Sequence, residues 1–172
     1  MSEMSIPKLV PLSNPLLHRK AQAVNVSEIK DQRFQLLLDN LVIAMRYYKG
    51  VGIAAPQIGI TKQIFVCEVN KNIRYPDAPD IPLQIYLNPH LTHVTSEVVI
   101  LQEGCLSVRH LRADVPRAQK VRLSALNRYG EIVGVDVEGF QARIFQHECD
   151  HLNGRLFLER VRDFSTVVKI RA

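Results

Sequence analysis

The segment "HECDH" near the end of the chain has the residue types and spacing of a catalytic metal site. Its H-E-x-x-H pattern is typical of two histidines that bind one ion beside a glutamate that acts as a base, here His147, His151 and Glu148. Because each helical residue advances about 100°, the two imidazoles share one helix face and Glu148 lies beside them. The segment therefore predicts hydrolysis by an activated water, provided that a third side chain completes the ligand set.

The third ligand decides which kind of metal site this is. One extended peptidase motif has a further histidine downstream, but Phe157 takes that position here and no histidine follows His151. The third ligand is therefore expected upstream, where the histidine and cysteine candidates are His18, Cys67, His90, His93, Cys105 and His110. Cys105 is favoured because it follows a glycine where the chain leaves a predicted strand. Its thiolate would suit Zn, Fe(II), Co or Ni.

Two helices are predicted from apolar residues at helical spacing. One covers about 31–48, with Ser27 as a candidate N-terminal cap, and the other covers about 140–153 and ends at Gly154. The second helix carries both histidines. We therefore expect an α+β fold: a single domain, 1–172, with antiparallel or mixed strands around a central metal-binding helix.

The strands come from segments with alternating apolar residues. They are predicted at 63–69, as a half-buried strand, and at 83–89, 97–104, 119–127 and 131–139, with a hairpin between the last two. The glycine-rich segment 49–59 and the proline-rich segment 73–82 are predicted as loops. The tail at 162–172 fits either a short helix or a strand.

Composition narrows the class of protein. Apolar residues make up 47% of the chain and charged residues 23%, which is ordinary for a globular protein. Three cysteines are too few and odd in number for a disulfide framework. The longest apolar runs are too short to span a bilayer, and the first residues lack the features of a secretory signal. We expect a cytoplasmic, bacterial protein, with an organellar origin left open.

Three motifs make the sequence resemble the peptide deformylase family. They are "GVGIAAPQ" at 50–57, "EGCLS" at 103–107 and "QHECDH" at 146–151, in the order found in that family. The similarity extends from "LLHRKAQAV" to "LFLERV". The resemblance implies an enzyme that removes the formyl group from N-formylmethionyl nascent peptides and releases formate.

The resemblance also assigns the metal site and the catalytic groups. It implies that Cys105, His147 and His151 bind one divalent metal ion, with Fe(II) expected and Zn, Ni or Co able to substitute. Glu148 would take a proton from the attacking water and deliver it to the leaving amine. The side-chain amide of Gln57 and the backbone N–H of Leu106 would stabilise the tetrahedral oxyanion.

Substrate contacts are expected at the glycines of the motifs and on the metal helix. Glycines lack a Cβ atom, so an added peptide strand could approach closely; these positions are Gly50, Gly52 and Gly104. Phe140 and Ile144 share the helix face of His147, which makes them candidates for a methionine pocket, with plain core packing as the alternative. The resemblance adds Arg112 as a substrate contact.

One departure from the family pattern affects the rim of the site. Arg109 and His110 stand where many relatives have a Pro-Gly or Pro-Glu pair. The preference for residues beyond formyl-methionine therefore stays open. Glu103, Gln146 and Asp150 are candidates to orient the ligands, with Arg117 as their counter-charge.

Two other functions remain compatible with the residues. A metallopeptidase would use the same helix, and an inactive homologue would bind metal or peptide without turnover. The formal net charge of +5 is modest, and we expect neither a membrane partner nor specific nucleic-acid binding. Basic residues in the tail could give weak, salt-sensitive attraction to the ribosome, or could be an ordinary solvated surface. They are Arg155, Arg160, Arg162, Lys169 and Arg171.

Overall fold

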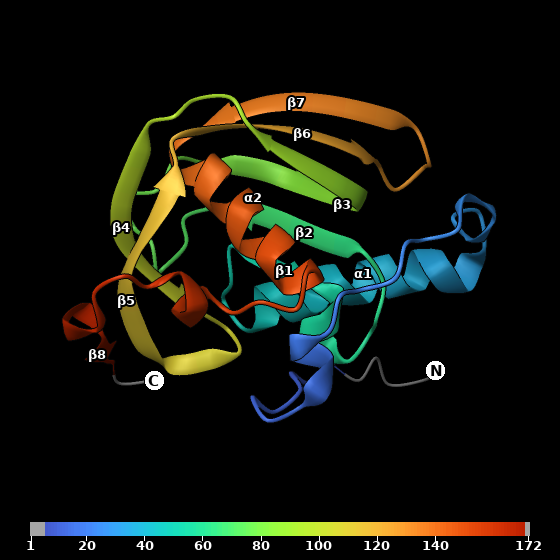
Figure 1. Ribbon diagram of the computed structural model, residues 1–172. Coiled ribbons are helices and arrows are strands. Elements are labelled where there is room, and N and C mark those ends of the chain that lie inside the picture. The colour runs from blue at the N-terminus through green and yellow to red at the C-terminus, as the bar shows by residue number, and fades with distance from the viewer. Residues whose placement is uncertain (1–5, 171–172) are drawn as a thin grey trace.

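The computed structural model describes residues 6–170 and has two antiparallel sheets that enclose one helix (Figure 1). The larger sheet has the strand order β1-β2-β3-β6-β7 and the smaller one β4-β5-β8. The strands are β1 (Gly52–Ala54), β2 (Ile64–Val69), β3 (Ile81–His93), β4 (Val98–Cys105), β5 (Val108–Ala118), β6 (Lys120–Leu126), β7 (Ile132–Glu138) and β8 (Val168–Lys169). The two long helices are α1 (Gln32–Tyr47) and α2 (Gly139–Leu152). The predicted α+β class and central helix are confirmed.

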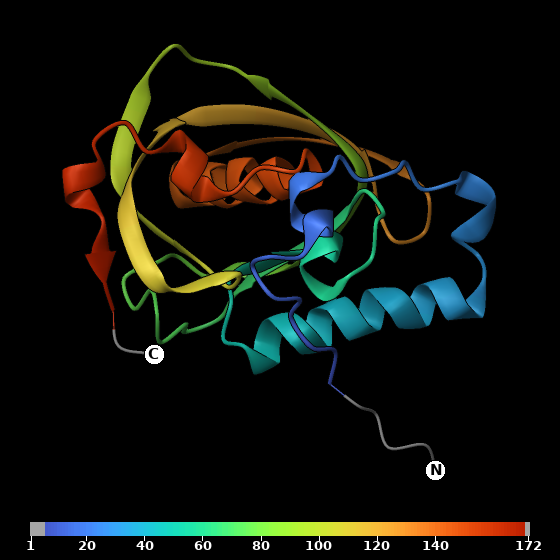
Figure 2. The same ribbon diagram turned by 60° about the horizontal axis from the view of Figure 1, so that its bottom comes forward.

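The two helices lie on opposite faces of the larger sheet, as Figure 2 shows. Strand β2 explains this arrangement, because its side chains alternate between two buried layers. Ile64 and Val66 belong to the apolar cluster around α1, while Phe65 and Cys67 belong to the cluster around α2. The alternating pattern had predicted a half-buried strand, and this expectation was wrong because helices cover both faces of the sheet.

Helix α2 ends where a glycine was predicted to end it. Gly154 has a φ of 71°, its N–H donates to His151 O, and the N–H of Arg155 donates to Asp150 O. These are the paired bonds of a Schellman motif, which needs the left-handed conformation that glycine adopts without strain. A Cβ atom on Gly154 would also lie 2.7 Å from the backbone of His18 and Arg19. The end of the metal helix is therefore packed directly on the N-terminal segment.

The smaller sheet differs most from the prediction. Strand β5 was not predicted, because it contains Pro116, and proline cannot donate to a sheet ladder. Pro116 pairs with Ile100 of β4, whereas β8 pairs with β5 only at Leu111 and Arg112. Proline is thus tolerated on a stretch of β5 that lies beyond its pairing with β8. The undecided tail contains the short strand β8, and the predicted loop at 49–59 contains β1.

Other local expectations had mixed outcomes. Asp31, not Ser27, caps α1: its carboxylate accepts the N–H of Arg33, while Ser27 lies in a separate 3₁₀ turn. The β6–β7 hairpin is confirmed. All three cysteines are free and buried. In the described part of the chain, no helix has the length and apolar character required to cross a membrane.

Candidate metal centre and active site

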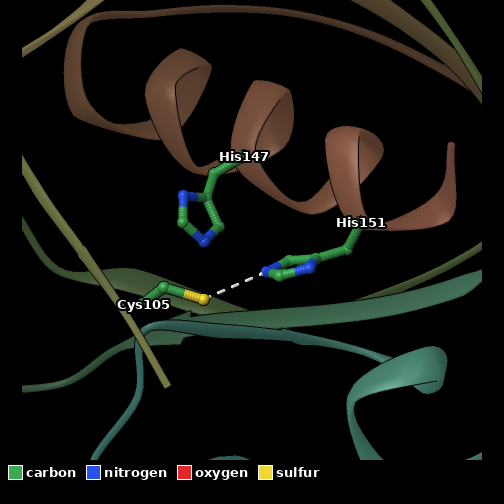
Figure 3. Close-up of side chains that lie close together, drawn as sticks. All are labelled: Cys105, His147 and His151. Atoms are coloured by element: carbon green, nitrogen blue, oxygen red, sulfur yellow. Dashed lines mark hydrogen bonds between the residues drawn. The ribbon is translucent and has the colours of Figure 1, made fainter. Parts of the chain in front are cut away.

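Three side chains converge between α2 and the end of β4 (Figure 3). His147 and His151 project from one face of α2, and Cys105 reaches toward them from the last residue of β4. The possible ligand atoms all lie within 4.8 Å of one another, and Cys105 Sγ is 3.3 Å from His151 Nε2. Within residues 6–170, this is the one group of three or more such side chains that could hold a metal ion.

The donor set fits a divalent ion. Tetrahedral coordination by sulfur and imidazole nitrogen requires ligand atoms about 3.5 Å apart, which these side chains approach. Burial raises the pKa of the Cys105 thiol, but the charges and hydrogen bonds of His151 and His147 lower its pKa well below the usual range. The N–H of Ser107 also points to Cys105 Sγ at 3.4 Å. A thiolate, the form of cysteine that binds metals, is therefore favoured at this position.

Glu148 lies beside this cluster as a buried carboxylate with an unused oxygen. It is only 4% exposed, and its Oε2 has no hydrogen-bond partner. Burial raises the pKa of Glu148 to about 7, the range in which a carboxylate can both take and return a proton near neutrality. A Cβ atom on Gly52 would lie 2.5 Å from Glu148 Oε1. Gly52 therefore has a definite packing role: it leaves room for the Glu148 carboxylate.

Gln57 directs its amide nitrogen into the site. Its Oε1 accepts the N–H of Ala54 at 2.8 Å, which fixes the orientation of the amide. Its Nε2 therefore faces Ser107 Oγ at 3.1 Å and Cys105 Sγ at 3.8 Å. Leu106 directly follows the cysteine; its side chain packs with the α1 cluster, and the residue also lines the pocket at this site. The backbone of Leu106 and the amide of Gln57 thus lie on the β4 side of the metal ligands.

A buried chain of charges orients His147. Its Nδ1 is 3.0 Å from Glu103 Oε2, and Glu103 in turn accepts bonds from Arg117 and Arg143. Arg117 also donates to Asp150 at 2.6 Å, and Arg160 donates to both oxygens of Asp150. Burial would raise the pKa of Glu103, but the hydrogen bonds and charges of His147 and Arg117 lower it well below its usual range. Glu103 therefore stays ionised and holds the imidazole in place.

Gln146 does not take part in this chain, although it belongs to the same motif. Its side-chain amide bonds to both backbone groups of Ala118 and to Ala142 O. The expectation that it orients a metal ligand was therefore wrong. Its amide replaces a backbone partner for β5, which fastens α2 to the smaller sheet.

A pocket opens beside the three metal-ligand candidates and contains most of the predicted substrate residues. Gly50, Gly52, Gly104, Phe140 and Ile144 all line it. Arg112 does not; its guanidinium lies 5.1 Å from the ring centroid of Tyr75, and it donates to Arg74 O. Sequence reasoning missed five lining residues, Arg74, Tyr75, Val51, Gln102 and Arg143. The first two come from the proline-rich loop, whose position depends on long-range packing.

An α+β fold with a cysteine, two histidines and a buried carboxylate around one pocket defines a class of metal-dependent hydrolases. Comparison with known sequences identifies the particular family: residues 6–166 match the model for polypeptide deformylase. The chain belongs to the polypeptide deformylase family. Proteins of this family that carry the name peptide deformylase are enzymes that remove the formyl group from N-terminal methionine.

Individual relatives agree with this family. Peptide deformylase 1 of Bordetella pertussis is 40% identical over 160 residues, which cover 93% of this chain and 90% of that protein. Peptide deformylase 1A of Arabidopsis thaliana, chloroplastic/mitochondrial, is 38% identical, and the match covers 96% of this chain but only 65% of that longer protein. A class I type b peptide deformylase of Acinetobacter baumannii with bound Met-Ala-Ser superposes with a TM-score of 0.88 at 38% identity, over 91% of this chain and 99% of that one.

Proposed function

We propose that this chain removes the formyl group from formyl-methionine at the start of newly made proteins, with Cys105, His147 and His151 as the metal ligands. The observation that carries the proposal is the position of Glu148. Its carboxylate is buried with one oxygen unpaired, and it lines the same pocket as Cys105 and His147, as a base that acts on one water requires. We further propose that residues 1–172 form one catalytic domain.

The residues around the cluster have distinct roles in this reaction. A divalent ion would supply a water of lowered pKa and would polarise the formyl carbonyl. Glu148 takes the proton of the attacking water and then gives it to the nitrogen of the leaving amine, so that formate and a free amino terminus result. Gln57 Nε2 and the N–H of Leu106 donate to the carbonyl oxygen as it gains negative charge. Glu103 holds His147 throughout.

The pocket supports methionine as the first residue. Phe140 and Ile144 give it an apolar wall, about two turns and one turn before His147 respectively, and Gly50, Gly52 and Gly104 leave the backbone accessible to an extended peptide. Arg112 does not line the pocket, but it holds in place the loop whose residues Arg74 and Tyr75 do line it.

Formate release separates this function from the alternatives. We expect formate from a formyl-Met peptide and no cleavage of its internal peptide bonds. Internal cleavage would indicate a metallopeptidase, and metal binding without formate would indicate an inactive homologue. Metal content measured after anaerobic purification would test the ligand set in the same preparation.

We propose Fe(II) as the native ion, with Zn, Ni or Co as substitutes. A thiolate beside Fe(II) is exposed to oxidation, either of the iron or of Cys105 to a sulfenic or sulfinic acid. The iron form should therefore lose activity in air while the nickel form persists. Equal air stability of the two forms, with iron shown to be bound, would contradict this assignment.

We propose a cytoplasmic site of action, or an organelle derived from bacteria, because the relatives are bacterial and plant organellar proteins. Contact with the ribosome then comes from weak attraction between the phosphates of ribosomal RNA and the basic side chains of the tail. Arg155 and Arg162 are exposed, but Arg160 is paired with Asp150, and Arg171 lies outside the described residues. Cosedimentation at low and moderate salt, with Arg162 and Lys169 neutralised in a comparison variant, would test this. Equal binding of the two proteins to ribosomes would show that the basic tail is not the contact.

A further inference from the structure

Two guanidinium groups lie close together at the rim of the active-site pocket. A Cβ atom placed on Gly104 would lie 3.3 Å from Arg74 Nη2 and 3.5 Å from Arg112 Nε. Both cations therefore lie against the backbone of Gly104, which directly precedes the metal-ligand candidate Cys105. Arg74 is half-buried and lines the pocket itself.

In the part of the chain that the structure describes, neither arginine has an acidic partner. Every ion pair formed within residues 6–170 involves other groups, and Asp77 and Asp80 of the same loop do not reach Arg74 or Arg112. Arg112 is held instead by the carbonyl of Arg74 and the ring of Tyr75. Two uncompensated like charges at the mouth of a pocket create a positive potential there.

The contrast with the other arginines near the metal centre is informative. Arg117 and Arg143 are buried more deeply, and both form an ion pair with Glu103. Arginines that support the fold of this site are thus paired with carboxylates, whereas Arg74, which lines the pocket, and the neighbouring Arg112 have no such pair among the described residues. An arginine fork in that position is suited to bidentate recognition of a carboxylate.

We propose that Arg74, together with Arg112, recognises an aspartate or glutamate side chain at the second or third residue of the peptide. This inference rests on the proposed function, which places the methionine against Phe140 and Ile144. A peptide anchored there leaves the pocket past Gly104, where the two cations lie. The site would then favour acidic residues after the formyl-methionine over their neutral isosteres.

Binding of product peptides tests this without depending on turnover. The probes are C-terminally amidated Met-Glu-Ser and Met-Gln-Ser, and Met-Ser-Glu and Met-Ser-Gln, so that no terminal carboxylate competes. Calorimetry on the metal-loaded protein at low salt should give about threefold to tenfold tighter binding for glutamate than for glutamine at one of the two positions. Raising the salt concentration should reduce this preference.

The substitution Arg74→Gln should abolish the preference, and Arg74→Lys should keep part of it. Arg33→Gln removes the same charge from an exposed, unpaired position on α1 and should leave the preference intact. Equal binding of glutamate and glutamine peptides at both positions by the unsubstituted protein, or a preference that survives Arg74→Gln, would overturn the inference. If the preference is present but the formylated peptides yield no formate, the peptide site stands and the proposed function fails.

Discussion

Helix α2 carries two sets of buried polar groups that differ in how fully they are bonded. On the side of the metal ligands, Glu148 Oε2 and His151 Nδ1 are buried without a hydrogen-bond partner. On the other side, the amide of Gln146 and the carboxylate of Asp150 are bonded throughout. Because an unpaired buried polar atom destabilises a fold, it persists where function requires it. Both sides of the helix are buried, so it is the unpaired polar atoms that distinguish the side of the metal-ligand candidates.

Cavity size alone would favour the other side of the helix. A hollow of about 890 Å³ lies on the fully bonded side, where Gln146, Asp150 and Arg117 line it. The pocket at the metal ligands measures only about 40 Å³. We assign the chemistry to the small pocket because the donor atoms and the unpaired carboxylate oxygen are there.

Substitutions on the fully bonded side of α2 should have the largest effect on the stability of the protein. Replacing Arg117 by leucine leaves Glu103 and Asp150 buried without their shared cation, which should lower the free energy of unfolding by about 3–5 kcal/mol. Urea unfolding would measure this. Arg122→Leu breaks the exposed pair with Asp136 and should cost less than about 1 kcal/mol. Similar losses of unfolding free energy in the two variants would show that the buried ion pairs of Arg117 stabilise the protein no more than an exposed pair does.

Substitutions on the side of the metal-ligand candidates should instead lower the activity. Glu148→Gln keeps the size of the side chain but removes the base, so formate release should fall by at least about 10²-fold while the metal content stays the same. Metal analysis and a formate assay on one preparation would check both. Loss of the metal in this variant would show that Glu148 is a ligand and not the base.

A smaller loss is expected when the base is only displaced. In Gly52→Ala the new methyl group meets Glu148 Oε1, which should reduce turnover by about tenfold to a hundredfold without loss of metal. Gly134→Ala is the matched control, since no atom lies within 4 Å of a Cβ there. Unchanged turnover in Gly52→Ala would mean that Glu148 has more freedom to move than its burial suggests.

The smallest effect concerns the exposed end of the charge chain. Burial raises the pKa of Asp150, but the bonds and charges of Arg160 and Arg117 lower its pKa below the ordinary value. This lowered pKa contributes stability that is present above about pH 4, the unfolded value, and is lost as the pH falls further. Arg160→Gln should therefore cost about 0.5–1 kcal/mol at pH 7, with less difference from the parent protein at pH 3. A difference that grows on acidification would contradict this origin.

Local patterns were enough to predict the helix, its glycine end and the spacing of the two histidines. Cys105 was favoured from its place after a glycine at the end of a strand, but the choice among upstream ligands was settled only by the family resemblance. Arg74 and Tyr75 could not be found, because their position depends on Arg112 and Phe140, which are distant in sequence. Strand β5 was not predicted, because proline argues against a strand. The local sequence around Pro116 cannot show that this part of β5 lies beyond its pairing with β8.

The packing of Gly154 on the N-terminal segment also bears on how the protein is made. Ala21 donates its N–H to Leu152 O, and Lys20 pairs with Asn153, so a segment that precedes α1 is completed by residues that follow the metal-ligand candidates. During translation this segment cannot reach its native packing until the end of α2 has left the ribosome. His147 and His151 emerge just before that point, so the metal site is assembled only after every strand of the larger sheet has been synthesised.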